Sequence, residues 1–252
     1  AYGSLLHDRR RALHARIVRA IEQLYADRLA EQVERLAHHA VHGEIWEEAV
    51  GYLQRAGQRA LERSANLEAV SHLTKGLEVL KALPHTPDRI QQELVLQVAL
   101  GPALVATKGY ASPDVEQAYT RARELCQQVG ETPRLFPVLF GLWFFYHVRA
   151  EFQKALELAE SLLTLAQREQ DSALQVQAHF ALGVDLFHLG EQARAQAHLD
   201  EGIALYDPQQ HRSLAFRYGQ DPGVTCRGYV RPLWVLGYPD QALHQSHEAL
   251  TL

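Results

Sequence analysis

Three histidines in one stretch come closest to the spacing of a metal site. His38 and His42 stand four residues apart with His39 between them, and Glu44 follows. Two histidines at positions i and i+4 of a helix can share one zinc ion, but zinc needs at least one further ligand. The turn at Gly43 takes Glu44 out of the register of that helix. We therefore interpret these histidines as residues that pack or solvate a turn, and we expect no metal and no cofactor.

The other residues with chemical potential form no catalytic arrangement. Cys126 and Cys226 are the only thiols and show no paired spacing, so neither a disulfide framework nor a zinc site is indicated. Glu47 and Glu48 form a carboxylate pair on a polar helix face, which needs no catalytic explanation. The sequence contains neither a GxxxxGK[ST] phosphate loop nor a kinase catalytic loop. We expect a non-catalytic chain.

Composition sets limits on the partners. The 252 residues carry a net charge of -5, with 47% apolar and 22% charged residues, so the chain can bury a substantial core. Nucleic-acid binding requires a concentrated basic face, and the net charge gives no electrostatic reason to expect it; we interpret the basic run Arg9-Arg10-Arg11 as a solvated helix face. The strongest apolar run, 138–146, is shorter than the roughly 20 residues of a membrane helix. We expect a cytoplasmic protein that binds neither nucleic acid nor membrane.

A regular order of large and small residues in 176–209 predicts two antiparallel helices joined by a tight turn. The small residues allow the backbones to approach, and leucines fill the remaining space. The pattern consists of Leu182, Gly183, Leu186, Gly190, Ala195, Leu199 and Gly202, followed by Asp207 and Pro208. This segment resembles the 34-residue tetratricopeptide repeat.

Helical periodicity extends along the whole chain, and no segment alternates with the period of a strand. The expected helices are 5–24, 28–42, 44–63, 66–83, 88–106, 113–129, 133–149, 151–169, 172–189, 191–206, 221–236 and 239–252. Buried alanines at 49, 118, 155, 195 and 242 are expected to pack the second helix of each hairpin on the first. The fold class is therefore all-α, a right-handed solenoid of antiparallel helix pairs of the tetratricopeptide-repeat type.

Helix ends have their own signals. Helix starts are expected at Thr86-Pro87, Ser112-Pro113, Thr132-Pro133 and Asp221-Pro222, where an N-cap oxygen precedes a proline. Helix stops or turns are expected at Gly109, Gly130, Gly190 and Gly237. An extra turn or short helix is expected within 207–220.

Beyond single repeats, the chain resembles the C-terminal repeat region of bacterial multidomain signalling ATPases. The segments that carry the resemblance are 107–126, 161–174, 181–191, 204–216, 218–224 and 236–243. In that family an AAA-like ATPase module, often behind a cyclase or kinase domain, precedes the repeats. The resemblance implies that 1–25 is a helix connecting an upstream ATPase module and that 26–252 is the repeat domain. The chain would then be a fragment whose catalytic domains lie elsewhere.

The sequence departs from that family at Arg227, Gly228, Arg231 and Pro232, where a more apolar helix is usual. Two explanations remain open, a local binding specificity and a kinked helix.

The aromatic segment 136–148 is apolar around its whole circumference. If the first helix of each hairpin lines a groove, the groove presents an apolar floor with cationic groups at one end. The expected groove residues are Phe140, Phe144, His147, Phe180, Phe187, His188, Arg227, Arg231 and Trp234. Such a groove suits a peptide, or a small ligand with a carboxylate or phosphate. In the alternative, the phenylalanines only close the superhelix on itself.

Two functions follow from these features. The first is a non-catalytic domain for protein–protein interaction in bacterial signal transduction, which binds a partner or the upstream ATPase domain of its own chain. The second is a sensor that binds an anionic small-molecule effector in the same groove.

Overall fold

The computed structural model describes residues 7–130, 133–212 and 221–251, and every regular element within these ranges is a helix. The predicted all-α fold of antiparallel helix pairs is confirmed. The chain divides into two compact units, 1–132 and 133–252, each with its own core. The assignment of 1–25 as a connecting helix stays a prediction. In the described ranges, no helix has the length and apolarity needed to cross a membrane.

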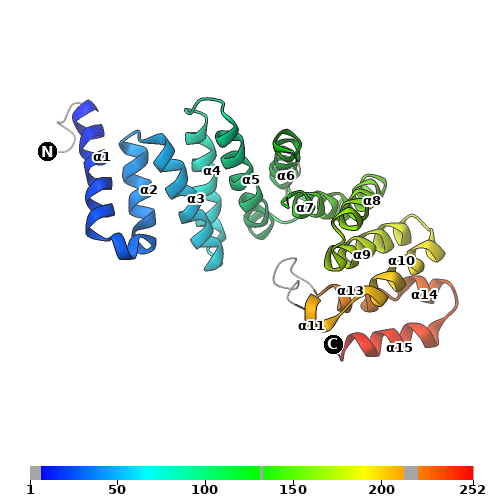
Figure 1. Ribbon diagram of the computed structural model, residues 1–252. Coiled ribbons are helices and arrows are strands. Elements are labelled where there is room, and N and C mark those ends of the chain that lie inside the picture. Colours follow the sequence, from blue (N-terminus) through cyan, green and yellow to red (C-terminus); the bar gives the residue numbers. More distant parts are fainter. Residues whose placement is uncertain (1–6, 131–132, 213–220, 252) are drawn as a thin grey trace. The chain divides into compact units, whose positions relative to one another are not determined.

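The first unit is a row of helices in which each packs on the next (Figure 1). Small and branched apolar side chains such as Ala56, Ala69 and Leu73 are completely buried between neighbouring helices. The elements are α1 (His7–Leu24), the 3-10 helix η2 (Ala26–Gln32), α2 (Val33–His42), α3 (Trp46–Glu62), α4 (Asn66–Leu80), α5 (Pro87–Lys108) and α6 (Pro113–Val129). The expected helix 28–42 therefore starts as a 3-10 segment.

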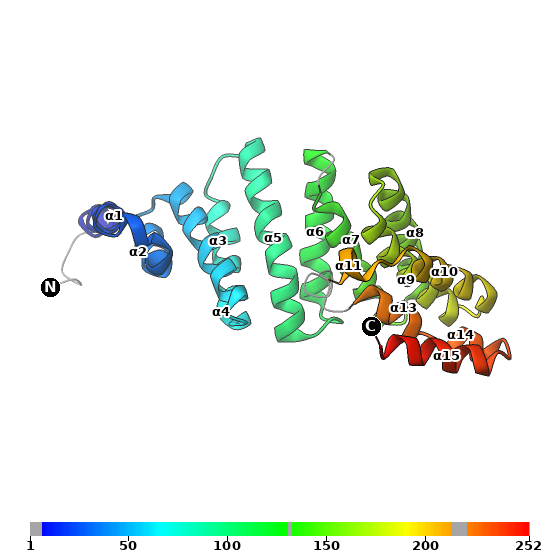
Figure 2. The same cartoon turned by 60° about the horizontal axis from the view of Figure 1, so that its bottom comes forward.

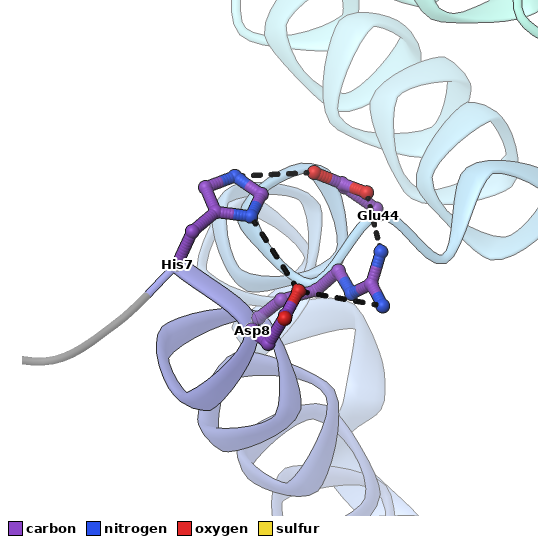
Figure 3. A network of polar contacts seen from close by, with 4 residues as sticks. His7, Asp8 and Glu44 are labelled. Carbon is purple, nitrogen blue, oxygen red and sulfur yellow. Dashed lines mark hydrogen bonds and ion pairs between the residues drawn. The ribbon is translucent and has the colours of Figure 1, made fainter.

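A polar network joins the start of α1 to the turn between α2 and α3 (Figure 3). Arg11 Nη1 lies 3.1 Å from Glu44 Oε2, and His7 Nε2 lies 3.5 Å from Glu44 Oε1. Glu44 has a positive φ of 53°, which the tight turn requires. Because these groups are partly exposed, their ion pairs contribute little to the free energy of unfolding. The network connects the start of α1 to the turn before α3.

The second unit contains the aromatic segment and the predicted repeat. Its elements are α7 (Leu135–Val148), α8 (Phe152–Glu169), α9 (Ser172–His188), α10 (Gln192–Leu205), α11 (Pro208–His211), α13 (Pro222–Gly228), α14 (Arg231–Val235) and α15 (Pro239–Ala249). α9 packs on both α8 and α10 and contacts α7 and α13, which explains why nearly its whole circumference is buried.

The same packing geometry occurs in both units. A Cβ atom added at Gly183 would lie 2.7 Å from Leu199 Cγ, and one added at Gly57 would lie 2.6 Å from Leu73 Cγ. The two glycines therefore let α9 approach α10 and α3 approach α4 in the same way. The repeat predicted at 176–209 thus has its counterpart in α3 and α4.

Most predicted helix ends are confirmed. Thr86, Ser112 and Asp221 accept hydrogen bonds from the first backbone N–H groups of α5, α6 and α13. The predicted stop glycines have φ values of 83–87°. α11 provides the short helix expected after Asp207, whereas Thr132 and 213–220 lie outside the described residues.

The single helix expected at 221–236 is wrong. The chain forms α13 and α14 instead, with a break at Tyr229 and Val230. Pro232 has no backbone N–H to bond the carbonyl of Gly228, so a continuous helix would lose that bond. Of the two explanations for the unusual residues here, the structure thus shows the interrupted helix.

Candidate functional site

The predicted groove residues all lie in the second unit, on α7, α9, α13 and α14, but their exposure differs. Phe140 and Phe180 are buried, with 7% of their surface exposed. Phe144 and Phe187 are half-buried. Phe140 packs against Trp143, and Phe180 meets the Tyr229 ring edge-on. The inner phenylalanines therefore belong to the core, and only the outer pair reaches the surface.

A completely buried carboxylate lies at the centre of this region. Asp185 has no exposed surface, and its Oδ2 accepts a hydrogen bond from Trp143 Nε1 at 2.6 Å. Its Oδ1 lies 2.7 Å from Nδ1 of His147, which donates to it. Burial raises the pKa of Asp185, while both hydrogen bonds favour its charged form. Asp185 thus ties α9 to two side chains of α7.

Asp185 and Trp143 were not among the predicted site residues. A signal was present, because Asp185 interrupts the apolar run of α9 and a carboxylate at a core position must have partners. The sequence does not reveal those partners, since they lie 38 and 42 residues away.

A second polar layer continues toward the surface. The His188 ring stacks on Phe152 with centroids 4.5 Å apart and lies 5.4 Å from the His147 ring. Its Nε2 is 3.1 Å from the hydroxyl of Tyr229. Burial lowers the pKa of His188, with a further contribution from His147. The neutral imidazole can therefore accept a hydrogen bond from Tyr229 at Nε2.

Arg231 forms the exposed end of this layer. Its Nη1 donates to the Tyr229 hydroxyl at 3.4 Å, and its guanidinium lies 5.0 Å from the Tyr229 ring centroid. Among the described residues, Arg231 has no carboxylate within ion-pair distance. An exposed guanidinium held over an aromatic ring is well placed to bind a carboxylate or phosphate from outside.

The other two predicted residues of the cationic end have different surroundings. Arg227 Nε lies 3.8 Å from Glu248 Oε2, and its guanidinium is 5.9 Å from the Tyr206 ring. Trp234 is 58% exposed on α14. Arg227 is thus directed toward α15 and Tyr206, whereas Arg231 is directed toward Tyr229.

The three clustered histidines lie in the first unit, where they contact a fourth histidine, His14, which was not among the histidines considered from sequence. His14 of α1 places its Nδ1 2.7 Å from Nδ1 of His39, and the His38 and His42 rings have centroids 4.2 Å apart. Burial lowers the pKa values of His14, His38 and His39. In the described residues, no group of three or more His, Cys, Asp or Glu side chains is arranged to hold a metal ion.

Comparisons with known proteins identify the fold. The chain is similar to the crystal structure of BtubC (BKLC) from P. vanneervenii, with a TM-score of 0.61, 15% identity, and coverage of 98% of this chain and 91% of that chain. It is also similar to Rap protein complexed with Competence and Sporulation Factor, with a TM-score of 0.59, 12% identity, and coverage of 97% and 75%. No protein-family model and no curated protein sequence matches. The helical-repeat fold is therefore shared with both structures.

Proposed function

We propose that the chain is a non-catalytic interaction domain that binds a protein partner on its second unit. The binding surface, which we call the aromatic face, consists of Phe144, Phe187, His188, Tyr229 and Arg231. The observation that carries the proposal is the combination of half-buried aromatic rings with an exposed guanidinium held over Tyr229. Tyrosine and arginine dominate the binding energy of protein interfaces, where a rigid aromatic floor loses little entropy on binding.

The comparisons support a binding role. The Rap structure contains that helical-repeat protein in complex with another molecule, the Competence and Sporulation Factor. The same fold is thus compatible with recognition of a partner. We further propose, from the sequence resemblance, that the chain acts within a signalling ATPase and that the upstream domains of such a protein are a partner.

The test compares the chain with a variant of its aromatic face. Tagged wild-type protein and Phe144→Ser/Phe187→Ser are used as bait in lysate from the source organism, and retained proteins are identified by mass spectrometry. Tyr110→Ser, at a 46% exposed aromatic residue of the first unit, is the matched control. We expect a protein that the wild type and the control retain and the double variant loses, while all three keep equal helical circular dichroism. Equal retention by the double variant would contradict the aromatic face.

A second candidate function is a sensor for an anionic small molecule. The specific observation in its favour is the chain of contacts from Arg231 through Tyr229 to His188, which offers a cation and a hydroxyl at one place. A metabolite that elutes from the wild-type bait would then bind Arg231→Ala more weakly by about 1.5–3 kcal/mol, the contribution of a charged hydrogen bond. Unchanged affinity in a calorimetric titration would exclude this role for Arg231.

A further inference from the structure

We propose that the exposed side of α15 binds a second copy of this chain, in a two-fold symmetric contact in which the two α15 helices run antiparallel. Figures 1 and 2 show α15 at the edge of the second unit, with α13 and α14 between it and α10. The inner side of α15 carries Ala242, which is completely buried. The proposal goes beyond the proposed function, because α15 contributes no residue to the aromatic face.

The packing of α3 shows what covers the corresponding side of a helix elsewhere in this fold. The fourth residue of α3 is a completely buried alanine, Ala49, as Ala242 is in α15. Val50 and Gly57, one and eight positions later, lie on one side of α3, since they are seven residues apart. Val50 has no exposed surface, and Gly57 is the place where Leu73 of α4 packs on α3. This side is therefore covered by a neighbouring helix.

The same side of α15 is uncovered. Counted from its own buried alanine, Leu243 and Leu250 occupy the two corresponding positions. Leu243 is 54% exposed and Leu250 is 84% exposed, whereas Leu156, the equivalent of Leu243 in α8, is 7% exposed. Two leucines seven residues apart form an apolar stripe along one side of a helix. α15 thus presents to solvent the side by which other helices of this fold contact a neighbour.

The exposed apolar area is that of a dimer interface. Six apolar side chains in and next to α14 and α15 are exposed, namely Trp234, Val235, Leu236, Tyr238, Leu243 and Leu250. They present about 450 Å2 to solvent, if a large aromatic side chain has roughly 200 Å2 and an aliphatic one roughly 100 Å2. A standard interface buries about 800 Å2 per partner, of which about 520 Å2 is apolar in homodimers. A second copy would therefore cover an area of the expected size.

The exposed side of α15 is complementary to itself. A two-fold axis that passes near Leu243, perpendicular to α15, makes the two helices antiparallel. Leu243 then lies beside the partner subunit's Leu243. Leu250 is about 10 Å further along the helix and lies near the partner subunit's Leu236, at the start of the partner's α15. Apolar side chains thus meet apolar side chains along the whole contact.

The charges of α15 also favour this arrangement. Glu248 lies 3.5 Å from His244 and 3.8 Å from Arg227, so this carboxylate has partners within its own chain. The first turn of α15 is acidic. An antiparallel pair separates the two acidic turns, whereas a parallel pair would place them side by side, where like charges repel.

The first test measures the mass of the complete 252-residue chain by sedimentation equilibrium. We expect the wild type, at tens of micromolar, to have about twice the 28.4 kDa mass of one chain. Leu243→Glu places two carboxylates at the symmetry axis and should raise the dissociation constant of the dimer about a hundredfold or more. Leu67→Glu is the matched control, because Leu67 is 77% exposed on α4 of the first unit. Both variants should keep the helical circular dichroism of the wild type.

Disulfide cross-linking tests the antiparallel arrangement. In Leu243→Cys the two new thiols lie close to the axis. In Leu250→Cys they lie about 20 Å apart, beyond the roughly 7 Å between Cα atoms that a disulfide spans. Oxidised glutathione should therefore link Leu243→Cys into a covalent dimer and leave Leu250→Cys unlinked. The native thiols of Cys126 and Cys226 are buried and should not compete.

Four outcomes would overturn the proposal. They are a monomeric wild type, which would leave α15 to a different partner, a dimer that Leu243→Glu leaves intact, assemblies larger than two chains, and equal cross-linking of the two cysteine variants. Phe144→Ser/Phe187→Ser should dimerise as the wild type does. If that variant alone is monomeric, the chain associates through the aromatic face, and the proposal for α15 fails while the aromatic face stands as a binding surface.

Discussion

The Nδ1 atom of His147 lies 2.7 Å from the Oδ1 atom of Asp185, which joins a partly exposed imidazole to a carboxylate that solvent does not reach. The same carboxylate accepts the indole N–H of Trp143. Two donors from α7 thus converge on one residue of α9, so the position of α7 against α9 depends on a single side chain. The aromatic face rests directly on this pair of helices.

Asp185→Asn should therefore destabilise the second unit. An amide presents one acceptor oxygen and one NH2 donor where the carboxylate presents two acceptors, so the Trp143 N–H or the His147 N–H loses its acceptor, and His147 keeps a hydrogen bond only as the tautomer with an unprotonated Nδ1. We expect a loss of about 1–3 kcal/mol in the free energy of unfolding, the cost of an unsatisfied buried donor. Urea unfolding followed by tryptophan fluorescence measures it. Asp240→Asn, at an exposed residue of α15, is the control. Equal midpoints for the two variants would show that the network does not stabilise the unit.

The close approach of paired helices predicts opposite effects for three glycine substitutions. Gly57→Ala and Gly183→Ala place a Cβ 2.6 and 2.7 Å from Leu73 and Leu199, so each should cost about 1–3 kcal/mol through overpacking. Gly51→Ala meets only the end of Arg55 at 3.9 Å and should stabilise α3 by about 0.5–1 kcal/mol. Thermal unfolding distinguishes the two effects, because destabilisation lowers the midpoint temperature and stabilisation raises it. Stabilisation by all three would refute the packing role of Gly57 and Gly183.

The contact between α1 and α2 should weaken in acid. Burial lowers the pKa of His14 and of His39 below the ordinary value near 6.5, and neighbouring histidines lower them further. Between the folded and unfolded pKa values, the unfolded state binds more protons, so stability falls as the pH falls from about 6.5 through the folded pKa values. The 2.7 Å contact between the two Nδ1 atoms also requires one neutral acceptor.

Urea unfolding at several pH values between 7.5 and 5 checks this dependence. We expect His14→Leu/His39→Leu to lose less stability over this range than the wild type does. His85→Leu, at an exposed histidine of the same unit, should behave as the wild type. If the free energy of unfolding fell equally with pH in the double variant and the wild type, other groups would cause the acid sensitivity.

The thiols should not react in the folded protein. Cys226 is 1% exposed, and burial raises its pKa to about 12, so almost no thiolate is present at pH 8. Cys126 is also buried, with 2% exposed. Titration with a chromogenic disulfide at pH 8 should detect no rapidly reacting thiol before denaturation and two afterwards. Rapid reaction of Cys226 in the native protein would show that α13 opens away from α10, since Cys226 lies against Gly202.

Several elements followed from local sequence because local interactions are enough to form them. The N-cap oxygens of Ser112 and Asp221 bond backbone groups two or three residues ahead, and Gly109 ends α5 by adopting a φ of 83°. Helical periodicity likewise identified the all-α fold. The exception was 221–236, where Pro232 was treated as part of a continuous helix although it cannot donate the bond that continuity needs.

The functional surfaces depended on the tertiary structure. From sequence, Phe140, Phe144, Phe180 and Phe187 were equivalent, but packing buries the inner two and leaves the outer two at the surface. The partners of Asp185 were equally inaccessible from sequence, because these contacts form between side chains of different helices. A helix repeats every 3.6 residues whichever neighbours it has, whereas the identity of those neighbours depends on how side chains of unequal volume fill the shared space. The sequence alone therefore determined the type of element and most of its ends, and only the tertiary structure decided which side chains are left for a partner.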